Sequence, residues 1–150
     1  MSIWKQVGKG GPEARAEQAM CLSEDGKSIF VFGGQASRKA FNDLWRFDIQ
    51  QQTWTRLGES AAGQPASRWG ATLTAHAGGL LLFGGEQADM TSYHSLYRFC
   101  LSDNTWSVPQ QQGAAPLARM MHTADVIDWK EGKGILGRRP APRVRRAPPC

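Results

Sequence analysis

Two short runs decide the fold: Ile29-Phe30-Val31-Phe32-Gly33-Gly34 and, 51 positions later, Leu80-Leu81-Leu82-Phe83-Gly84-Gly85. Each is an apolar run bounded by glycines, the pattern of a strand buried on both faces. Glycine tolerates a positive φ and lets another backbone approach closely. Each Gly pair therefore predicts the end of a strand at a place where neighbouring sheets converge. The recurrence directs attention to an internal repeat.

Four further markers return in the same order at spacings of 50 to 53 residues. They are Pro12-x-x-Arg15, Pro65-x-x-Arg68 and Pro116-x-x-Arg119; Leu44-Trp45-Arg46-Phe47 and Leu96-Tyr97-Arg98-Phe99; Thr53-Trp54 and Thr105-Trp106; and Trp4, 50 residues before Trp54. Each unit reads as four short strands joined by polar turns, with no amphipathic helix. The first strand follows the arginine, as in residues 70–74. The third covers Leu44 to Asp48 and Leu96 to Cys100, and the fourth centres on Trp54 and Trp106.

The order of these markers, including Asn42-Asp43-Leu44-Trp45 within the unit, resembles the kelch repeat over about Trp4 to Asp128. The resemblance implies radial four-stranded blades of a β-propeller, usually used for protein–protein interaction. The expected fold is all-β: two kelch-type blades, part of a third, and a disordered basic C-terminal tail. The repeat residues expected to have structural roles are Gly33, Gly34, Trp45, Trp54, Gly84, Gly85, Tyr97 and Trp106.

The repeat markers divide the chain into five segments. Residues 1–10 are an isolated strand of the fourth type, 11–58 are repeat 1, 59–110 are repeat 2, 111–128 begin repeat 3, and 129–150 form a divergent tail. In repeat 3 the Gly pair is expected near Ile135 and Leu136, which are not glycines. Residues 138–150 hold four prolines and five arginines, so we expect no strand and no order there.

Closure of a propeller takes about four to eight blades, so this array is incomplete. We expect a truncated product, a splice or reading-frame variant, or a partial sequence; completion of the ring by a second chain is the alternative. The exposed blade faces predict marginal stability or self-association.

The net charge of +5 belongs to the tail. Residues 1–128 carry a charge of −1 and residues 129–150 a charge of +6. The body therefore has no electrostatic footprint for specific nucleic-acid binding. The tail is either a nuclear localisation or anion-binding segment or an accidental end from an altered reading frame. No apolar run is long enough for a signal peptide or a membrane span, so we expect a cytoplasmic protein, with the nucleus as the alternative.

The three cysteines and three histidines are scattered along the chain. Cys21, Cys100 and Cys150 form no disulfide framework or metal pair, which favours a reducing compartment. His76, His94 and His122 lie in different units, and a structural role is expected for His122. The sequence contains no nucleophile–base motif. We therefore expect no cofactor, no metal and no catalytic residue; an oxidase or lyase of the kelch-like type is the alternative.

Arg15, Arg68 and Arg119 are the candidate partner-binding residues, because they occupy equivalent positions at the junctions between blades. Guanidiniums on one face could grip acidic peptide segments bidentately. The alternative is that each arginine satisfies backbone carbonyls within its own blade. The loops from Gln35 to Phe41 and from Glu86 to Tyr93 are further candidates. The expected function is a non-enzymatic module that binds another protein; a truncated isoform without independent function, or one that interferes with a full-length form, is the alternative.

Overall fold

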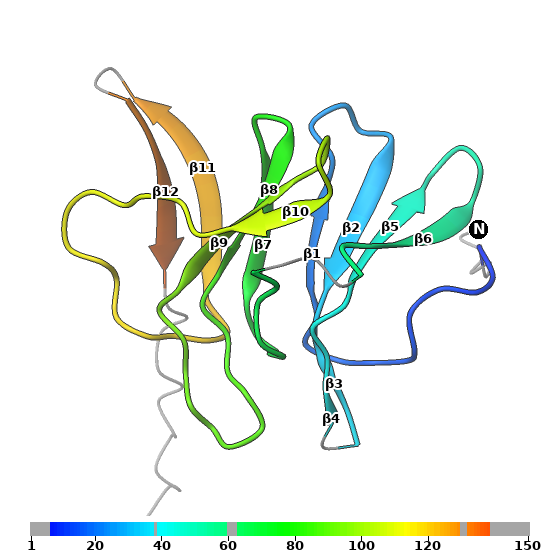
Figure 1. Cartoon of the computed structure of the whole chain (residues 1–150), viewed down its shortest axis with the longest axis horizontal. Helices are drawn as coiled ribbons and strands as arrows, with labels where there is room; N and C mark the ends of the chain where they lie inside the picture. Colours follow the sequence, from blue (N-terminus) through cyan, green and yellow to red (C-terminus); the bar gives the residue numbers. More distant parts are fainter. Residues whose placement is uncertain (1–6, 38, 60–62, 130–131, 139–150) are drawn as a thin grey trace, which may run out of the picture.

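The computed structural model describes residues 7–37, 39–59, 63–129 and 132–138, and every regular element in these ranges is a β-strand (Figure 1). The Trp4 segment lies outside them. The first sheet, blade 1, has the order β1-β2-β5-β6, formed by β1 (Ala19–Leu22), β2 (Ser28–Phe32), β5 (Leu44–Asp48) and β6 (Thr53–Leu57). The second sheet, blade 2, runs β7-β8-β9-β10, formed by β7 (Thr72–His76), β8 (Gly79–Phe83), β9 (Leu96–Cys100) and β10 (Thr105–Ser107).

Two smaller sheets complete the described fold. β3 (Gln35–Ala36) and β4 (Lys39–Ala40) form a hairpin after the first Gly pair. β11 (Thr123–Trp129) and β12 (Gly132–Arg138) form the third unit, an antiparallel pair. All pairing within the two blades is antiparallel, as expected for short strands joined by tight turns. The predicted all-β fold with two four-stranded blades and part of a third is confirmed.

The strand positions agree with the sequence prediction except at two places. The first strand of blade 2 begins at Thr72, two residues later than expected from the arginine. β12 lies inside the segment 129–150 that the sequence division assigned to the tail. The sequence division ended the third unit at residue 128 because the expected Gly pair is absent, although the chain continues there into a second strand; β11 and β12 have seven residues each, against five in β7 and β8. Thr123 pairs with Arg138 as Thr72 pairs with Phe83, so Arg138 is the counterpart of Phe83 in the strand register.

The core lies between blades 1 and 2. Because side chains alternate along a strand, Ala19 and Cys21 of β1 face blade 2, whereas Met20 and Leu22 point the other way. The core residues are Ala19, Phe30, Phe32, Leu44, Leu73, Leu80, Leu82, Phe99 and Trp106. Trp106 packs edge-on against Phe32 of the other blade at 5.4 Å between ring centroids, a contact worth about 1 kcal/mol beyond burial. The repeated tryptophan thus fills the gap between sheets.

The same backbone hydrogen bonds join each unit to the next. Gly34 N–H donates to the Arg68 carbonyl at 2.9 Å, and Gly85 N–H donates to the Arg119 carbonyl at the same distance. Two further bonds repeat: Arg68 N–H to Phe41 O and Gly70 N–H to Glu17 O, with counterparts from Arg119 to Tyr93 and from Met121 to Gly70. We call this set of three bonds the inter-blade joint.

The Gly pairs are required by the inter-blade joint. Gly33 and Gly84 have φ values of 64° and 68°. A Cβ on Gly84 would lie 2.6 Å from the Arg119 carbonyl oxygen, and one on Gly33 would clash with the carbonyl oxygen of Arg68. Both uses of glycine expected from the sequence, positive φ and close approach, are confirmed.

Candidate functional site

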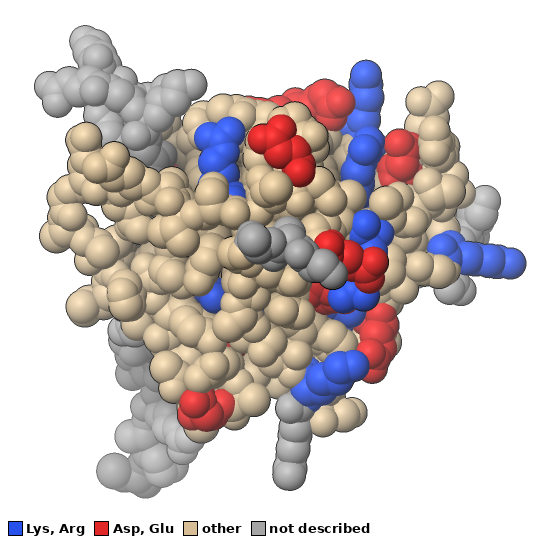
Figure 2. All heavy atoms as spheres, viewed as in Figure 1, with Lys and Arg blue, Asp and Glu red and all other residues tan. Residues whose placement is uncertain are grey.

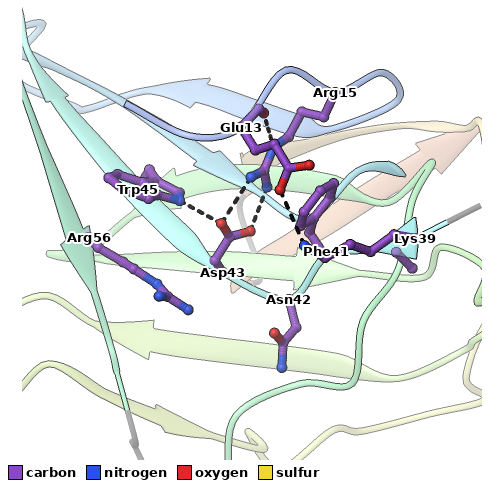
Figure 3. Close-up of a pocket in the computed structure, with 9 residues that line it drawn as sticks. Glu13, Arg15, Lys39, Phe41, Asn42, Asp43, Trp45 and Arg56 are labelled. Carbon is purple, nitrogen blue, oxygen red and sulfur yellow. Dashed lines mark hydrogen bonds and ion pairs between the residues drawn. The ribbon is translucent and has the colours of Figure 1, made fainter. Parts of the chain in front are cut away.

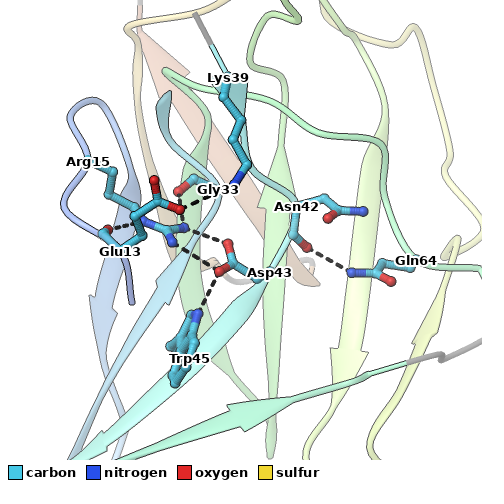
Figure 4. Close-up of polar contacts among 8 residues, drawn as sticks. All are labelled: Glu13, Arg15, Gly33, Lys39, Asn42, Asp43, Trp45 and Gln64. Carbon is cyan, nitrogen blue, oxygen red and sulfur yellow. Dashed lines mark hydrogen bonds and ion pairs between the residues drawn. The ribbon is translucent and has the colours of Figure 1, made fainter. Parts of the chain in front are cut away.

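Arg15 is held inside blade 1 by its own blade (Figure 4). Its guanidinium donates to both carboxylate oxygens of Asp43, at 2.5 and 3.0 Å, and to the carbonyls of Glu13 and Gly33. It also lies over the Phe41 ring, 3.9 Å from the centroid. The side chain is 4% exposed. This bidentate geometry is the strong form of an arginine–carboxylate pair.

Asp43 is the counter-ion of blade 1, at the start of β5. Burial by itself raises the pKa of Asp43, but the hydrogen bonds from Arg15 and the Trp45 indole N–H, together with the Arg15 charge, outweigh burial and hold the pKa below its usual value. The predicted structural role of Trp45 therefore includes donation of a hydrogen bond at 2.6 Å. The ion pair fixes the start of β5 against the Pro-x-x-Arg segment.

Arg68 occupies the equivalent place in blade 2 without a carboxylate. Ser95 stands where blade 1 has Asp43, and its hydroxyl accepts a long hydrogen bond of 3.3 Å from Arg68. The guanidinium also donates to the carbonyls of Ala66 and Gly84. Its carbon lies 4.0 Å from the centroid of Tyr93 and 5.2 Å from that of Tyr97. Blade 2 therefore keeps the cation–π contact that Arg15 makes with Phe41, adds a second ring, and lacks the ion pair.

Arg68 is the most deeply buried of the three junction arginines, with 1% of its surface exposed. Its Nη2 atom is buried without a hydrogen-bond partner. Burial lowers the pKa of Arg68, and the tyrosines Tyr97 and Tyr93 oppose that shift. A buried cation without a carboxylate is costly, so the tyrosine rings are required to offset it.

Arg119 differs from both because the third unit lacks the surrounding elements in the described residues. Its backbone completes the inter-blade joint, but its side chain is half-buried and, among the described residues, donates only to the carbonyl of Leu117 at 2.9 Å. Arg68 and Arg119 therefore share a backbone role, whereas the three arginine side chains do not form one exposed ring. This geometry corresponds to the alternative in which each arginine satisfies carbonyls within its own blade.

A pocket of about 330 Å³ opens beside the Arg15–Asp43 pair (Figure 3). Its lining residues are Glu13, Arg15, Lys39, Ala40, Phe41, Asn42, Asp43, Trp45 and Arg56. Lys39 and Arg56 are paired with Glu13 and Glu59 in exposed ion pairs of 3.2 and 2.7 Å. Such pairs are weak and exchange readily with water. Two of the residues that line the pocket also join blade 1 to the segment before blade 2: Arg68 N–H donates to Phe41 O, and the Gln64 side chain donates to Asn42 O.

The two long loops project from the same edge of the array (Figure 1). The β3–β4 hairpin turns at Ser37, which has a φ of 46°. The loop from Glu86 to Tyr93 is braced internally: the Tyr93 hydroxyl donates to Gln87 at 2.7 Å, and the Thr91 N–H donates to Asp89 at 2.9 Å. Met90 at its tip is 76% exposed. An exposed apolar side chain on a fixed loop is suited to contact another molecule.

His122 is a structural residue, as expected. It is 6% exposed, packs edge-on against Phe83 at 5.3 Å, and shares a hydrogen bond of 3.1 Å between Nε2 and the Thr72 hydroxyl. Burial and the charge of Arg119 lower its pKa. Within the described residues, no three His, Cys, Asp or Glu side chains gather in a way that could hold a metal ion. No helix in the same residues is long and apolar enough to cross a membrane.

The surface charge of the described residues is mixed. On the face shown in Figure 2, basic and acidic side chains lie beside one another amid broad uncharged areas. This agrees with the nearly neutral body expected from the sequence, since the excess basic charge falls in residues 129–150. The last twelve residues, including Cys150, lie outside the described residues.

The sequence analysis did not assign roles to Asp43, Ser95 or Tyr93. Asp43 carried a usable signal, because it lies in the Asn-Asp-Leu-Trp segment of repeat 1. Its replacement by Ser95 in repeat 2 hid the pairing. Tyr93 and Phe41 occupy equivalent places in the two blades and both lie against the arginine. An aromatic three residues before the third strand was a second signal.

Comparison with known proteins agrees with the fold. The KLHDC2/KLHL20/DRC7 kelch-repeats domain matches residues 2–135. Similar proteins include the leucine-zipper-like transcriptional regulator 1 homolog of Drosophila melanogaster, 29% identical over 83% of this chain, and acyl-CoA-binding domain-containing protein 4 of Arabidopsis thaliana, 33% identical over 84%. The chain spans only 13% and 18% of the lengths of these two relatives. With its repeated blades, Gly pairs and matching domain, the chain belongs to the kelch-repeat family.

Proposed function

We propose that this chain is a non-enzymatic protein-interaction module whose contact surface is the loop edge formed by the β3–β4 hairpin and residues 86–93. The observation that carries the proposal is Met90, 76% exposed at the tip of an internally hydrogen-bonded loop. A loop that is already ordered loses little conformational freedom on binding. Kelch domains typically mediate protein interactions, which supports the same proposal.

The junction arginines have an indirect role in this proposal. Arg68 lies under the loop, where it contacts the ring of Tyr93 and the Ser95 hydroxyl. With 1% of its surface exposed, it cannot reach a partner directly in this conformation. Arg68 therefore acts as a positioning residue for the loop, as Arg15 does through Asp43 for the β3–β4 side. We place the partner contacts on the loops, and none on the tail beyond Arg138.

The test is site-specific photo-crosslinking in the full chain. A photoreactive amino acid is placed at Met90, at Ser37, or at the control position Ile49, which is 40% exposed on the β5–β6 turn. We expect the probes at Met90 and Ser37 to form discrete crosslinked products with a partner protein. An excess of the unlabelled chain should compete for the partner and abolish these products, whereas an excess of unlabelled M90D should not. Truncation after Arg138 should leave them unchanged. Equal crosslinking from Ile49, or loss on truncation alone, contradicts the proposal.

A further inference from the structure

Ser95 occupies the position in blade 2 that a carboxylate occupies in blade 1. Ser95 and Asp43 are each the residue directly before the third strand of their blade. The backbone agrees, because the Ser95 carbonyl accepts a hydrogen bond of 3.2 Å from Gly84 and the Asp43 carbonyl accepts one of 3.1 Å from Gly33. The two side chains therefore start from the same point of the blade, one with an anionic group and the other with a hydroxyl.

In blade 1 the carboxylate is surrounded by hydrogen-bond donors (Figure 4). Asp43 accepts from both terminal nitrogens of Arg15 and from the indole N–H of Trp45. Blade 2 has a counterpart of each donor. Arg68 stands in the place of Arg15, and Tyr97 is the second residue of β9 as Trp45 is of β5. A phenol hydroxyl can donate to an anion as an indole N–H does. Blade 2 thus contains the donors of an anion site around a neutral hydroxyl.

The guanidinium of Arg68 has a donor that no group in the described residues satisfies. Its Nε donates to Ala66 O, and its Nη1 donates to Gly84 O and, at 3.3 Å, to the Ser95 hydroxyl. Its Nη2 is buried without a hydrogen-bond partner, in a residue with 1% of its surface exposed. A buried cationic donor without an acceptor is destabilising. An acceptor introduced at Ser95 would lie beside this group.

Ser95 is also more accessible than the strand that follows it. It is partly exposed, it comes directly after the exposed His94, and it lies one residue outside the pairing of β8 with β9. Among the described residues, its hydroxyl makes only the long hydrogen bond to Arg68. A weakly bonded hydroxyl at the end of a loop is available for transfer of a phosphoryl group.

We propose that Ser95 is a phosphorylation site whose phosphate is the counter-ion of Arg68, as a carboxylate is the counter-ion of Arg15 in blade 1. The donor is a nucleoside triphosphate bound to a protein kinase. A bond forms between the Ser95 oxygen and the γ-phosphorus, and the bond from that phosphorus to the bridging oxygen of the β-phosphate breaks. The nucleoside diphosphate leaves, and the hydroxyl proton passes to a basic side chain of the kinase.

The phosphate suits this position in charge and in reach. It carries a charge of about −1.5 to −2 at pH 7. The Ser95 oxygen already lies 3.3 Å from Nη1 of Arg68, so phosphate oxygens bonded to it come within reach of the guanidinium. Such charge-assisted hydrogen bonds are stronger than the present bond to a neutral hydroxyl. Arg68 also contacts the ring of Tyr93 at the end of the loop 86–93, so the phosphate holds this loop more firmly to blade 2.

The first measurement asks whether Ser95 is modified. The full chain is expressed in eukaryotic cells with phosphatases inhibited, and its phosphopeptides are mapped by mass spectrometry. Fragmentation of the peptide must separate Ser95 from the nearby Thr91 and Ser92. We expect phosphate on Ser95, and its loss from that peptide position in the control variant Ser95→Ala. Absence of phosphate from Ser95 overturns the proposal.

The second measurement asks whether the phosphate pairs with Arg68. Phosphoserine is incorporated genetically into the full chain in place of Ser95 or, as the matched control, in place of the exposed Ser102, which lies beside Asp103. Phosphorus NMR follows the binding of the second proton to each phosphate as the pH is lowered. Because a guanidinium favours the dianion, we expect the phosphate at position 95 to bind this proton about tenfold more weakly than the phosphate at position 102. Arg68→Met should abolish the difference.

Arg68→Met also removes contacts that support blade 2, so a third measurement keeps Arg68 in place. In denaturing urea the fixed contacts are lost, and the two phosphates should bind the proton with similar affinity. In the folded chain, phosphate on Ser95 should raise the melting temperature by about 3 °C, and phosphate on Ser102 should leave it unchanged. Equal proton binding by the two phosphates in the folded chain, or a melting temperature that phosphate on Ser95 does not raise, overturns the proposal. None of these readouts involves a binding partner, so the contact surface around Met90 can fail independently.

Discussion

Blades 1 and 2 each bury an arginine at the equivalent position, but different side chains surround it. In blade 1, Arg15 pairs bidentately with Asp43. In blade 2, Arg68 lies against Tyr93 and Tyr97 and has only a serine hydroxyl where the carboxylate would be. The backbone hydrogen bonds that join blade 1 to blade 2 at Arg68 are repeated at Arg119, between blade 2 and the third unit. The difference shows that the repeat preserves the joint between blades, while the counterpart of the arginine side chain varies.

Substitution of the first glycine in each Gly pair, which both inter-blade joints share, is expected to change the free energy of unfolding the most. Gly33→Ala forces a Cβ onto the Arg68 carbonyl at a φ of 64°, and Gly84→Ala does the same against Arg119. We expect each substitution to lower the free energy of unfolding by about 4 kcal/mol, measured by urea denaturation. Gly26→Ala is the control, since it has a φ of 70° but nothing within 4 Å of its Cβ; it should cost about 1 kcal/mol. Equal costs at Gly26 and Gly33 would refute a close-packed joint.

The next largest effect is expected at the residue beside the arginine, which is Asp43 in blade 1 and Ser95 in blade 2. Asp43→Ala leaves the buried guanidinium of Arg15 without its counter-ion, and we expect a loss of about 3 kcal/mol. Ser95→Ala at the equivalent place removes only a long hydrogen bond and should cost less than about 1 kcal/mol. The two values are compared by urea denaturation under the same conditions. Similar losses in the free energy of unfolding would mean that the Ser95 hydroxyl and the Asp43 carboxylate stabilise their blades equally, which contradicts the difference inferred between the blades.

The comparison can also be reversed by giving blade 2 the missing carboxylate. Ser95→Asp places an acid beside Arg68, whose Nη2 atom is buried and unpaired. We expect a gain of about 1 kcal/mol in the free energy of unfolding, because a buried cation acquires a partner at the position used in blade 1. The contrary outcome is that Ser95→Asp lowers the free energy of unfolding by the same amount whether residue 68 is arginine or has been changed by Arg68→Met. That result would show that the introduced carboxylate does not reach the guanidinium.

The smallest expected effect concerns pH. The pKa of His122 is lowered from its usual 6.5 by burial and by the charge of Arg119, so the unfolded chain binds the proton more readily. Stability supplied by the neutral ring of His122 is therefore present above pH 6.5 and falls as the pH drops below it. The contribution of Asp43 to stability does not interfere in this range, because it is lost only as the pH falls below 3.8. Thermal melts between pH 7.5 and 5 should show a decline that His122→Gln reduces; an unchanged decline would contradict this role.

Much of the fold could be predicted because each strand of the repeat is marked by a sequence segment that recurs in both blades. The bounds of β5 and β9 follow from the Leu-Trp-Arg-Phe and Leu-Tyr-Arg-Phe segments, and the Gly pairs mark the ends of β2 and β8. The extent of the third unit could not be predicted in the same way. Its strands are each two residues longer than their counterparts in blade 2, so counting from the repeat period misplaced the end of β12.

The site was less predictable than the fold. Position in the repeat identified Arg15, Arg68 and Arg119, but not what their side chains contact. The partners of Arg15 and Arg68 lie 28 and 27 residues further along the chain, and one is an acid while the other is a serine. Burial of a guanidinium depends on how strands, loops and rings meet in space. Sequence spacing alone therefore left binding and structural roles open.

The account rests most heavily on the claim that the junction arginines build the blades, and the unfolding free energies of Arg68→Met and Arg119→Met test it directly. Arg68 is 1% exposed and contacts two carbonyls and two rings, whereas the half-buried Arg119 side chain bonds one carbonyl. Urea denaturation should show a loss of about 3 kcal/mol for Arg68→Met and less than about 1 kcal/mol for Arg119→Met. If the stability of Arg68→Met equals that of the unsubstituted chain, the guanidinium does not support blade 2, and the structural role assigned to it is wrong.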